Sequence, residues 1–237
     1  MICYNNFNNK KLKKEGEKMS YGVSVEVWGE YALFTRPEHK AERVSYEALT
    51  PSAARGILEA IFWHPGMTWI IDCIYVLKPI QFAAVKKNEV RSKINARTVS
   101  AAIKKEQGSL YLAASEDRQQ RAAVMLKDVH YVIKAHFELT DKANPSDNHG
   151  KFSDIIKRRL RRGQCFHQPY FGTREFPAHF RIWDGTEIQT AYPNETRDLG
   201  YMLYDMDYSD PMNIRPIFFH ALLKNGVLDL RDCEVQR

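Results

Sequence analysis

The alternation of apolar and polar side chains over residues 129–139 constrains the fold of this chain more than any other feature of its sequence. Every second residue in this segment is apolar, and the positions between them include His130, Lys134, His136 and Glu138. Side chains of a strand point in turn to the two faces of its sheet. The pattern therefore predicts a strand with one face on a hydrophobic core and one polar face.

Three other segments have strand patterns. Residues 23–28 and 176–182 alternate in a similar way, and residues 69–77 are almost entirely apolar, as is typical of a central strand. A looser stretch at about 86–127 is rich in charged residues and has Gly108 in its middle. We interpret this stretch as an insertion that contains marginal helices.

Two segments have helical patterns. Thr50 and Pro51 offer an N-cap and a first-turn proline to a helix that should end near His64, because Pro65 follows. Residues 148–162 combine an apolar stripe at three- and four-residue spacing with a polar face that is almost entirely cationic. The order of the elements predicts an α+β fold with a ferredoxin-like β-α-β-β-α-β domain, of the kind that RNA-recognition modules use.

Composition and turn residues divide the chain into three parts. Residues 1–18 lack an apolar run long enough for a secretory signal or a membrane span, so we expect a disordered leader, or sequence upstream of a start at Met19. Residues 19–184 should form the ferredoxin-like domain with its insertion. Residues 185–237 contain frequent turn residues and should form a small antiparallel β-rich domain, with one helical turn near Phe218–Leu223.

The cysteines indicate the compartment. Cys3, Cys73, Cys165 and Cys233 show no paired spacing, which argues against a zinc knuckle and against a disulfide framework. We therefore expect a cytoplasmic protein.

The cationic face of residues 148–162 indicates a polyanionic partner. Six lysines and arginines within twelve residues repel one another unless a polyanion neutralises them, and only Asp154 offsets them. Aromatic and hydrogen-bonding residues follow directly, a mixture that stacks on unpaired bases and holds phosphates; an ordinary solvated face is the alternative. The expected RNA-binding residues are Lys157, Arg158, Arg159, Arg161, Arg162, Phe166, His167, Tyr170 and Arg174.

Two histidines of the third predicted strand leave two interpretations open. His130 and His136 share its polar face, with Lys134 between them. They either line an RNA surface or pack beneath the C-terminal part of the chain.

Five separated blocks of this sequence occur in the same order in one known family. They are WGEYALFTRPE at 28–38, GILEAIFWHP at 56–65, LKPIQF at 77–82, LKDVHYVIKAHFEL at 126–139 and YFGTREF at 170–176. Together they resemble the CRISPR-associated protein five of subtype I-C, also called the Dvulg subfamily. The resemblance runs from about Tyr21 to the C-terminus.

This resemblance implies a member of the repeat-associated RNA-binding superfamily, with a ferredoxin-like N-terminal domain and a small C-terminal β-domain. It implies an endoribonuclease of antiviral defence that cuts the CRISPR precursor RNA at each repeat hairpin, with no metal and no cofactor. Such a protein then stays on the mature guide RNA with the other subunits of the type I-C interference complex. Double-stranded DNA is a further partner that the resemblance suggests.

The catalytic residues of the family are only partly present. Relatives use a tyrosine at the end of the first helix and an adjacent Lys-His pair at the start of the second, and the matching positions here are Phe62, Lys151 and Phe152. The reaction is an attack of the ribose 2′-hydroxyl on the neighbouring phosphate, and phenylalanine can neither accept nor donate the protons involved. The expected catalytic residues are Lys151 and the nearby substitutes His149, His64 and Tyr46.

Three functions therefore stay open. The first is a metal-independent endoribonuclease specific for the repeat. The second is a catalytically weak or silent RNA-binding subunit, which the phenylalanines favour. The third is a metal-dependent DNA nuclease that would use Asp205, Asp207 and Asp210, a cluster that starts like a calcium loop but has Pro216 where the loop needs its final glutamate.

Overall fold

A computed structural model gives the arrangement of residues 22–39, 41–105, 110–185 and 187–236, referred to below as the described residues. The leader expected at residues 1–18 lies outside them.

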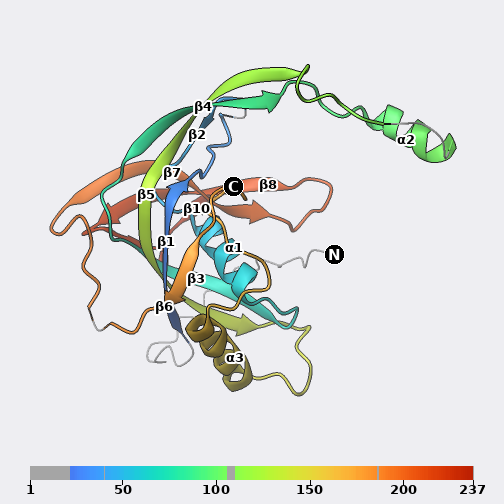
Figure 1. The fold of residues 1–237 in the computed structure, drawn as a ribbon. Helices are drawn as coiled ribbons and strands as arrows, with labels where there is room; N and C mark the ends of the chain where they lie inside the picture. Colours follow the sequence, from blue (N-terminus) through green and yellow to red (C-terminus); the bar gives the residue numbers. More distant parts are fainter. Residues whose placement is uncertain (1–21, 40, 106–109, 186, 237) are drawn as a thin grey trace.

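Four strands and two helices make up the centre of the fold (Figure 1). The strands are β1 (Val23–Ala32), β3 (Met67–Val76), β5 (Arg118–Leu139) and β6 (His179–Ile182). They lie in the order β6-β1-β5-β3, and each is antiparallel to its neighbours. The helices α1 (Pro51–Ile61) and α3 (His149–Arg162) follow β1 and β5 in the chain, so the six elements occur in the predicted order, with other elements added between them.

The two helices begin and end where their sequences direct. The Thr50 side chain accepts a hydrogen bond from the Ala53 N–H at 3.2 Å, and the Asn148 side chain accepts one from the Lys151 N–H at 2.9 Å. Each of these N-caps satisfies a backbone donor that the first turn leaves free. Helix α3 ends at Gly163, whose φ of 61° lies in the left-handed region that glycine tolerates best.

Strand β5 is much longer than predicted. Its C-terminal half belongs to the central sheet, and its N-terminal half pairs with β4 (Phe82–Val90) as an arm, with α2 (Ala96–Lys105) near the tip (Figure 1). The short β2 (Arg43–Val44) pairs with β5 in parallel. The insertion predicted to contain marginal helices does contain one helix, α2, but it also contains the end of β4 and the start of β5, which were not predicted. Both faces of β4 lie largely in solvent, so its polar side chains hide the period-two pattern that marks a half-buried strand.

The C-terminal part of the chain is a set of antiparallel strands. They are β7 (Thr196–Asp207), β8 (Arg215–Lys224), β9 (Val227–Asp229) and β10 (Val235–Gln236). The helical turn predicted near Phe218–Leu223 is wrong, because these residues belong to β8. Ile217, Phe219, Ala221 and Leu223 are buried at every second position, a period that suits a strand.

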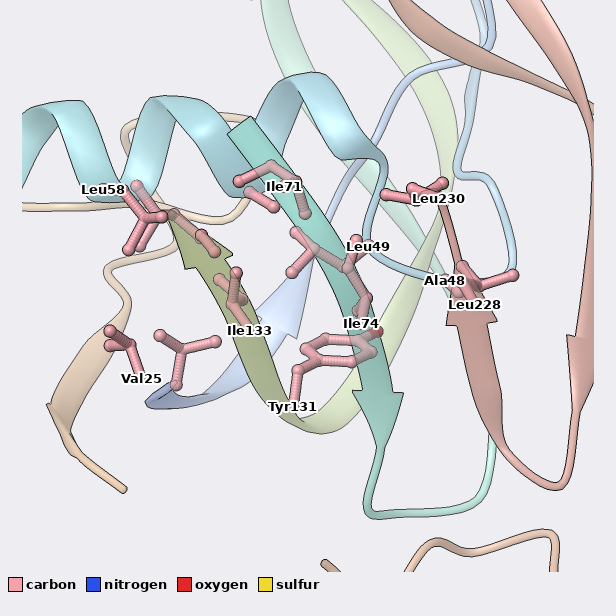
Figure 2. Close-up of a cluster of buried hydrophobic side chains, with 14 of the residues drawn as sticks. Val25, Ala48, Leu49, Leu58, Ile71, Ile74, Tyr131, Ile133, Leu228 and Leu230 are labelled. Atoms are coloured by element: carbon pink, nitrogen blue, oxygen red, sulfur yellow. The ribbon is translucent and has the colours of Figure 1, made fainter. Parts of the chain in front are cut away.

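The C-terminal strands continue the central sheet. Strand β9 pairs with β3 from Cys73 to Tyr75, and all strands of the described residues belong to one sheet of ten. Figure 2 shows the shared core: Leu228 and Leu230 lie beside Ala48 at one side of it, Ile74 of β3 pairs with Leu228, and the side chains of β5, β1 and α1 continue the cluster toward the other side. The predicted boundary at residue 184 therefore falls within a continuous sheet and a shared core.

Candidate functional site

The candidate site lies where the C-terminal end of α1 meets the N-terminal end of α3. Phe62 caps α1 in an extended conformation, and its ring centroid is 5.9 Å from that of Phe152. The His64 ring lies 5.0 Å from the Phe152 ring, and Lys151 precedes Phe152 in the first turn of α3. The fold therefore brings His64 and Lys151 to the same place, around two buried phenylalanines.

Asp147 joins these two residues, and the sequence analysis missed it. Its Oδ1 accepts a hydrogen bond from Lys151 Nζ at 2.7 Å, and its Oδ2 lies 3.9 Å from His64 Nδ1. The backbone N–H of Asn144 also donates to this carboxylate, whose side chain is only 1% exposed. The hydrogen bond from Lys151 lowers the pKa of Asp147, so the carboxylate stays ionised at neutral pH. The sequence signal is the spacing of four residues between Asp147 and Lys151.

The environment of His64 fixes where its proton lies. The backbone N–H of Gly66 donates to His64 Nδ1 at 3.0 Å, so a neutral ring carries its proton on Nε2. In that form Nε2 donates hydrogen bonds and cannot abstract a proton. The His64 side chain is 29% exposed, so a ligand can approach it from solvent.

His149 lies in the same aromatic cluster as Phe152 and His64. It is the first residue of α3, and its ring stacks on Phe137 with a centroid distance of 5.7 Å and an interplanar angle of 24°. Phe137 also packs edge-on against Phe152 at 6.1 Å. The side chain of His149 is half-buried and is held beside the cluster through Phe137.

Tyr46 lies at the other end of α1. An eleven-residue helix is about 16 Å long, so the structure does not bring Tyr46 to Lys151. Burial raises the pKa of Tyr46, whose ring is covered by the Arg36 guanidinium at 4.7 Å. Tyr46 and Tyr170 line a cleft of about 350 Å³ beside the N-terminal end of α1.

The cationic face of α3 is adjacent to the site. Arg158, Arg161 and Arg162 are exposed, and none of them has an ion-pair partner among the residues that the structure describes. Lys157 is half-buried. Arg159 has a different role, because its Nη1 donates to the Ile61 carbonyl at 2.6 Å and its guanidinium lies 5.1 Å from the Phe62 ring centroid.

The aromatic residues that follow α3 are held against α1. The backbone N–H groups of Phe166 and His167 both donate to the Ala60 carbonyl, at 2.9 and 3.1 Å. Their rings contact each other at 4.3 Å, and Phe166 is 72% exposed. Tyr170 and Arg174 are exposed on the loop that leads to β6. The predicted RNA-binding residues of this region thus extend from α3 into the loop beyond it.

The arrangement suits the stabilisation of a phosphate better than the removal of a proton. Lys151 brings an ammonium group on a side chain that is 44% exposed, and His64, on the other side of the Asp147 carboxylate, brings an N–H donor. Donors and cations of this kind stabilise negative charge that develops on phosphate oxygens. Phe62 and Phe152, which lie at the centre of the site, have no group that could transfer a proton.

The acidic cluster noted in the sequence begins with Asp205 of β7, and this residue has a structural role. Asp205 accepts hydrogen bonds from Arg55 of α1 at 2.8 and 3.1 Å. Within the described part of the chain, no three His, Cys, Asp or Glu side chains gather in a way that could hold a metal ion. No helix among the described residues is long and apolar enough to cross a membrane.

Comparison with known proteins identifies the family. The chain matches the family model described as CRISPR-associated protein (Cas_Cas5) over residues 22–231, and it therefore belongs to this family of CRISPR-associated proteins. It is similar to proteins named CRISPR pre-crRNA endoribonuclease Cas5d from Mannheimia succiniciproducens and Thermus thermophilus. The first is 50% identical over 217 residues, which cover 90% of this chain and 96% of the relative. The second is 39% identical over 225 residues, which cover 88% and 90%. The family predicted from the sequence blocks, subtype I-C Cas5, is confirmed.

Two solved structures have a similar fold. One, described as a CRISPR-associated protein, has a TM-score of 0.66 and 24% identity, and the match covers 91% of this chain and 96% of that one. The other is a functionally uncharacterized protein, SMU1763c from Streptococcus mutans, with a TM-score of 0.65, 22% identity and coverage of 91% and 97%. At these identities the likeness concerns the fold alone.

Proposed function

We propose that this protein is an endoribonuclease that cuts CRISPR precursor RNA at its repeat hairpins and then stays on the guide RNA. The observation that carries the proposal is the group of His64, Asp147 and Lys151, which lies beside the exposed cations of α3. The two relatives named CRISPR pre-crRNA endoribonuclease Cas5d support the same activity. The other subunits of the interference complex, and double-stranded DNA, are the further partners that we expect for this cytoplasmic protein.

The strand order supports a ferredoxin-like assignment for the centre of this fold. The order β6-β1-β5-β3, antiparallel throughout, is what a β-α-β-β-α-β unit produces when its first and third strands lie in the middle. We regard the strands after residue 184 as a small antiparallel addition that joins this unit at β3.

The proposed chemistry assigns a role to each residue of the site. The 2′-hydroxyl attacks the adjacent phosphate, the bond to the 5′-oxygen breaks, and the products carry a 2′,3′-cyclic phosphate and a 5′-hydroxyl. The Lys151 ammonium stabilises the added negative charge, and Asp147 holds that ammonium in position. His64 donates its Nε2 hydrogen to a phosphate oxygen. Water accepts the proton of the 2′-hydroxyl, and water also gives the leaving 5′-oxygen its proton, because Phe62 and Phe152 carry no acid or base. Each missing general acid or base costs about 10²- to 10⁴-fold in rate, so the cut should be slow.

A second candidate function follows from Phe62 and Phe152. Both are buried, and neither can transfer a proton, so an RNA-binding subunit with weak or no cleavage is the alternative.

One experiment separates these functions. The purified protein is incubated with its own repeat hairpin, first in a chelator and then with added Mg²⁺, and the products are resolved on a denaturing gel. A single cut in the chelator, ending in a cyclic phosphate, supports the endoribonuclease. Binding without any cut supports the silent subunit. A cut that appears only with the metal ion contradicts both and favours a metal-dependent nuclease.

A further inference from the structure

The face of the central sheet opposite α1 and α3 carries a second group of aromatic and cationic side chains. We name it the β1–β6 platform, and it consists of Trp28, His130, His179 and Arg181. Trp28 pairs in register with His179 of β6 on one side and with His130 of β5 on the other. The Trp28 and His179 rings are stacked, with centroids 5.7 Å apart and an interplanar angle of 23°.

A buried carboxylate holds the platform in place. Glu26 accepts a hydrogen bond from Arg181 Nη2 at 3.1 Å and lies 2.7 Å from His130 Nε2, while its own side chain is 4% exposed. Burial alone would raise the pKa of Glu26, but the hydrogen bonds from Arg181 and His130 hold it below its usual value. Glu26 is therefore an anion that fixes two side chains of the platform, one on each side of Trp28.

The exposed end of the platform can accept a ligand. His179 is exposed, and the Arg181 side chain is 65% exposed. Strand β6 is the last strand on its side of the described sheet, so a flat ring can extend the stack of Trp28 and His179 at this edge. Arg181 uses Nε and Nη2 for Glu26, and its Nη1 has no hydrogen-bond partner among the described residues. That nitrogen still carries two donors for an anion.

The platform adjoins the cationic face of α3 across a single strand. Helix α3 packs against β6, and Phe180 and Ile182 of β6 face the core on that side. His179 and Arg181 alternate with them and therefore point to the opposite face. A strand of RNA that leaves the exposed arginines of α3 needs only to cross the edge of β6 to reach the platform.

We propose that the β1–β6 platform is a second binding site for single-stranded RNA. An unpaired base stacks on His179, at the end of the ring pair, and Arg181 binds the phosphate beside that base. A stacked ring pair next to a guanidinium whose Nη1 still has donors to offer suits this ligand, because each nucleotide offers a flat base and an anionic phosphate. The inference rests on the proposed function, since it takes RNA bound along α3 as its starting point and assigns the platform to the unpaired sequence that flanks the hairpin.

The test compares four variants by fluorescence anisotropy with two labelled RNAs, the repeat hairpin alone and the hairpin with its unpaired flank. His179→Ala and Trp28→Ala should each weaken binding of the flanked RNA by about 5- to 100-fold, the usual effect of losing a base-stacking ring. His179→Phe keeps a flat ring and should bind within about threefold of the wild type. The control is Tyr201→Ala, which removes an aromatic side chain that is 53% exposed on β7 and contacts a histidine at 5.6 Å; it should change nothing.

The hairpin alone should bind all four variants as it binds the wild type. Melting temperatures identify any variant that fails to fold. If Trp28→Ala fails to fold, the comparison of His179→Ala with His179→Phe decides, because His179 is exposed. Equal binding of the flanked RNA by His179→Ala and the wild type would overturn the inference, whatever the cleavage assay gives. If the wild type does not cleave the hairpin, but His179→Ala still loses binding of the flanked RNA, the platform is supported and only the endoribonuclease function is overturned.

Discussion

At the scale of single residues, the proposed chemistry depends most on Lys151. We expect Lys151→Ala to lower the single-turnover cleavage rate by at least about 10²-fold, because one preorganised charge next to the phosphate is lost. The dissociation constant should change by less than about tenfold, since the interaction strengthens mainly as charge develops in the transition state. Lys157→Ala is the matched control on the same helix, and it should leave the single-turnover cleavage rate of RNA that is already bound unchanged. A Lys151→Ala protein that cuts at the wild-type rate would rule out this site.

Phe152 offers the converse test. Phe152→His places an imidazole at the family position, 5.0 Å from the His64 ring, and should raise the cleavage rate measured in single turnover. Phe152 is 1% exposed, so the same change should lower the melting temperature. Phe152→Leu is the control, because it disturbs the packing without adding a proton-transfer group. Equal rates for the two variants would show that the lost imidazole does not limit this protein.

His136 on the open face of the sheet should make stability depend on pH. Its hydrogen bond to Asp72 at 2.9 Å raises the pKa of His136 above the ordinary value of 6.5. The extra stability is therefore fully present below about pH 6.5 and is lost as the pH rises through the raised pKa. The melting temperature of the wild type should exceed that of His136→Gln by more at pH 6 than at pH 9. The same difference at both pH values would mean that the pair does not titrate as described.

The residues of the site were only partly accessible to sequence reasoning. Lys151 and His64 could be placed because each lies next to a helix end that caps and prolines mark. Asp147 was missed, because its spacing from Lys151 gains meaning only once the loop after β5 is seen to pack against the residues that follow α1. His130 and His136 were left between two interpretations, and each proved to be paired with a buried carboxylate of a neighbouring strand, Glu26 or Asp72.

The cationic face of α3 acts at the scale of an element. Replacing Arg158, Arg161 and Arg162 together by alanine should reduce the slope of log affinity against log salt by about 2 to 3 units, since each lost phosphate contact removes about 0.7 to 0.9. Affinity should be measured by anisotropy at several salt concentrations. Arg159→Ala is the informative contrast, because it removes the donor to the Ile61 carbonyl and should lower the melting temperature instead. An unchanged slope in the triple variant would show that this face does not contact the RNA backbone.

The elements that sequence patterns could predict are those with one buried face. Residues 129–139, 51–61 and 149–162 each bury one side against the core, so the period of their apolar residues reports the element directly. Strand β4 has no buried residue, and the first residues of β5 that pair with it, Arg118–Gln120, are exposed, so this part of the pairing left little trace in the sequence. Residues 218–223 were misassigned because their length also fits one helical turn, and only the buried alternation of β8 decides between the two.

At the scale of the whole molecule, we expect the joint between the C-terminal strands and the central sheet to determine how the described part of the chain unfolds. Strand β9 pairs with β3, and its Leu228 is 1% exposed in the core that Figure 2 shows beside Ile74. Such a joint should make the described part of the chain one cooperative unit rather than two domains. The sequence could mark a change of character near residue 184, but not that later strands return to the edge of the first sheet.

Leu228→Ala tests this cooperativity. The change removes a buried leucine at the joint and should cost about 2–5 kcal/mol of unfolding free energy, distributed over the whole chain. Calorimetry should therefore give a single transition at a lower temperature. Intrinsic tryptophan fluorescence, which reports four residues that all precede residue 185 (Trp28, Trp63, Trp69 and Trp183), should shift by the same amount. Leu222→Ala is the matched control, because Leu222 is 37% exposed on β8 and its loss should cost little. Two separate transitions in Leu228→Ala, with fluorescence unchanged in the first, would mean that residues 185–237 form an independent domain after all.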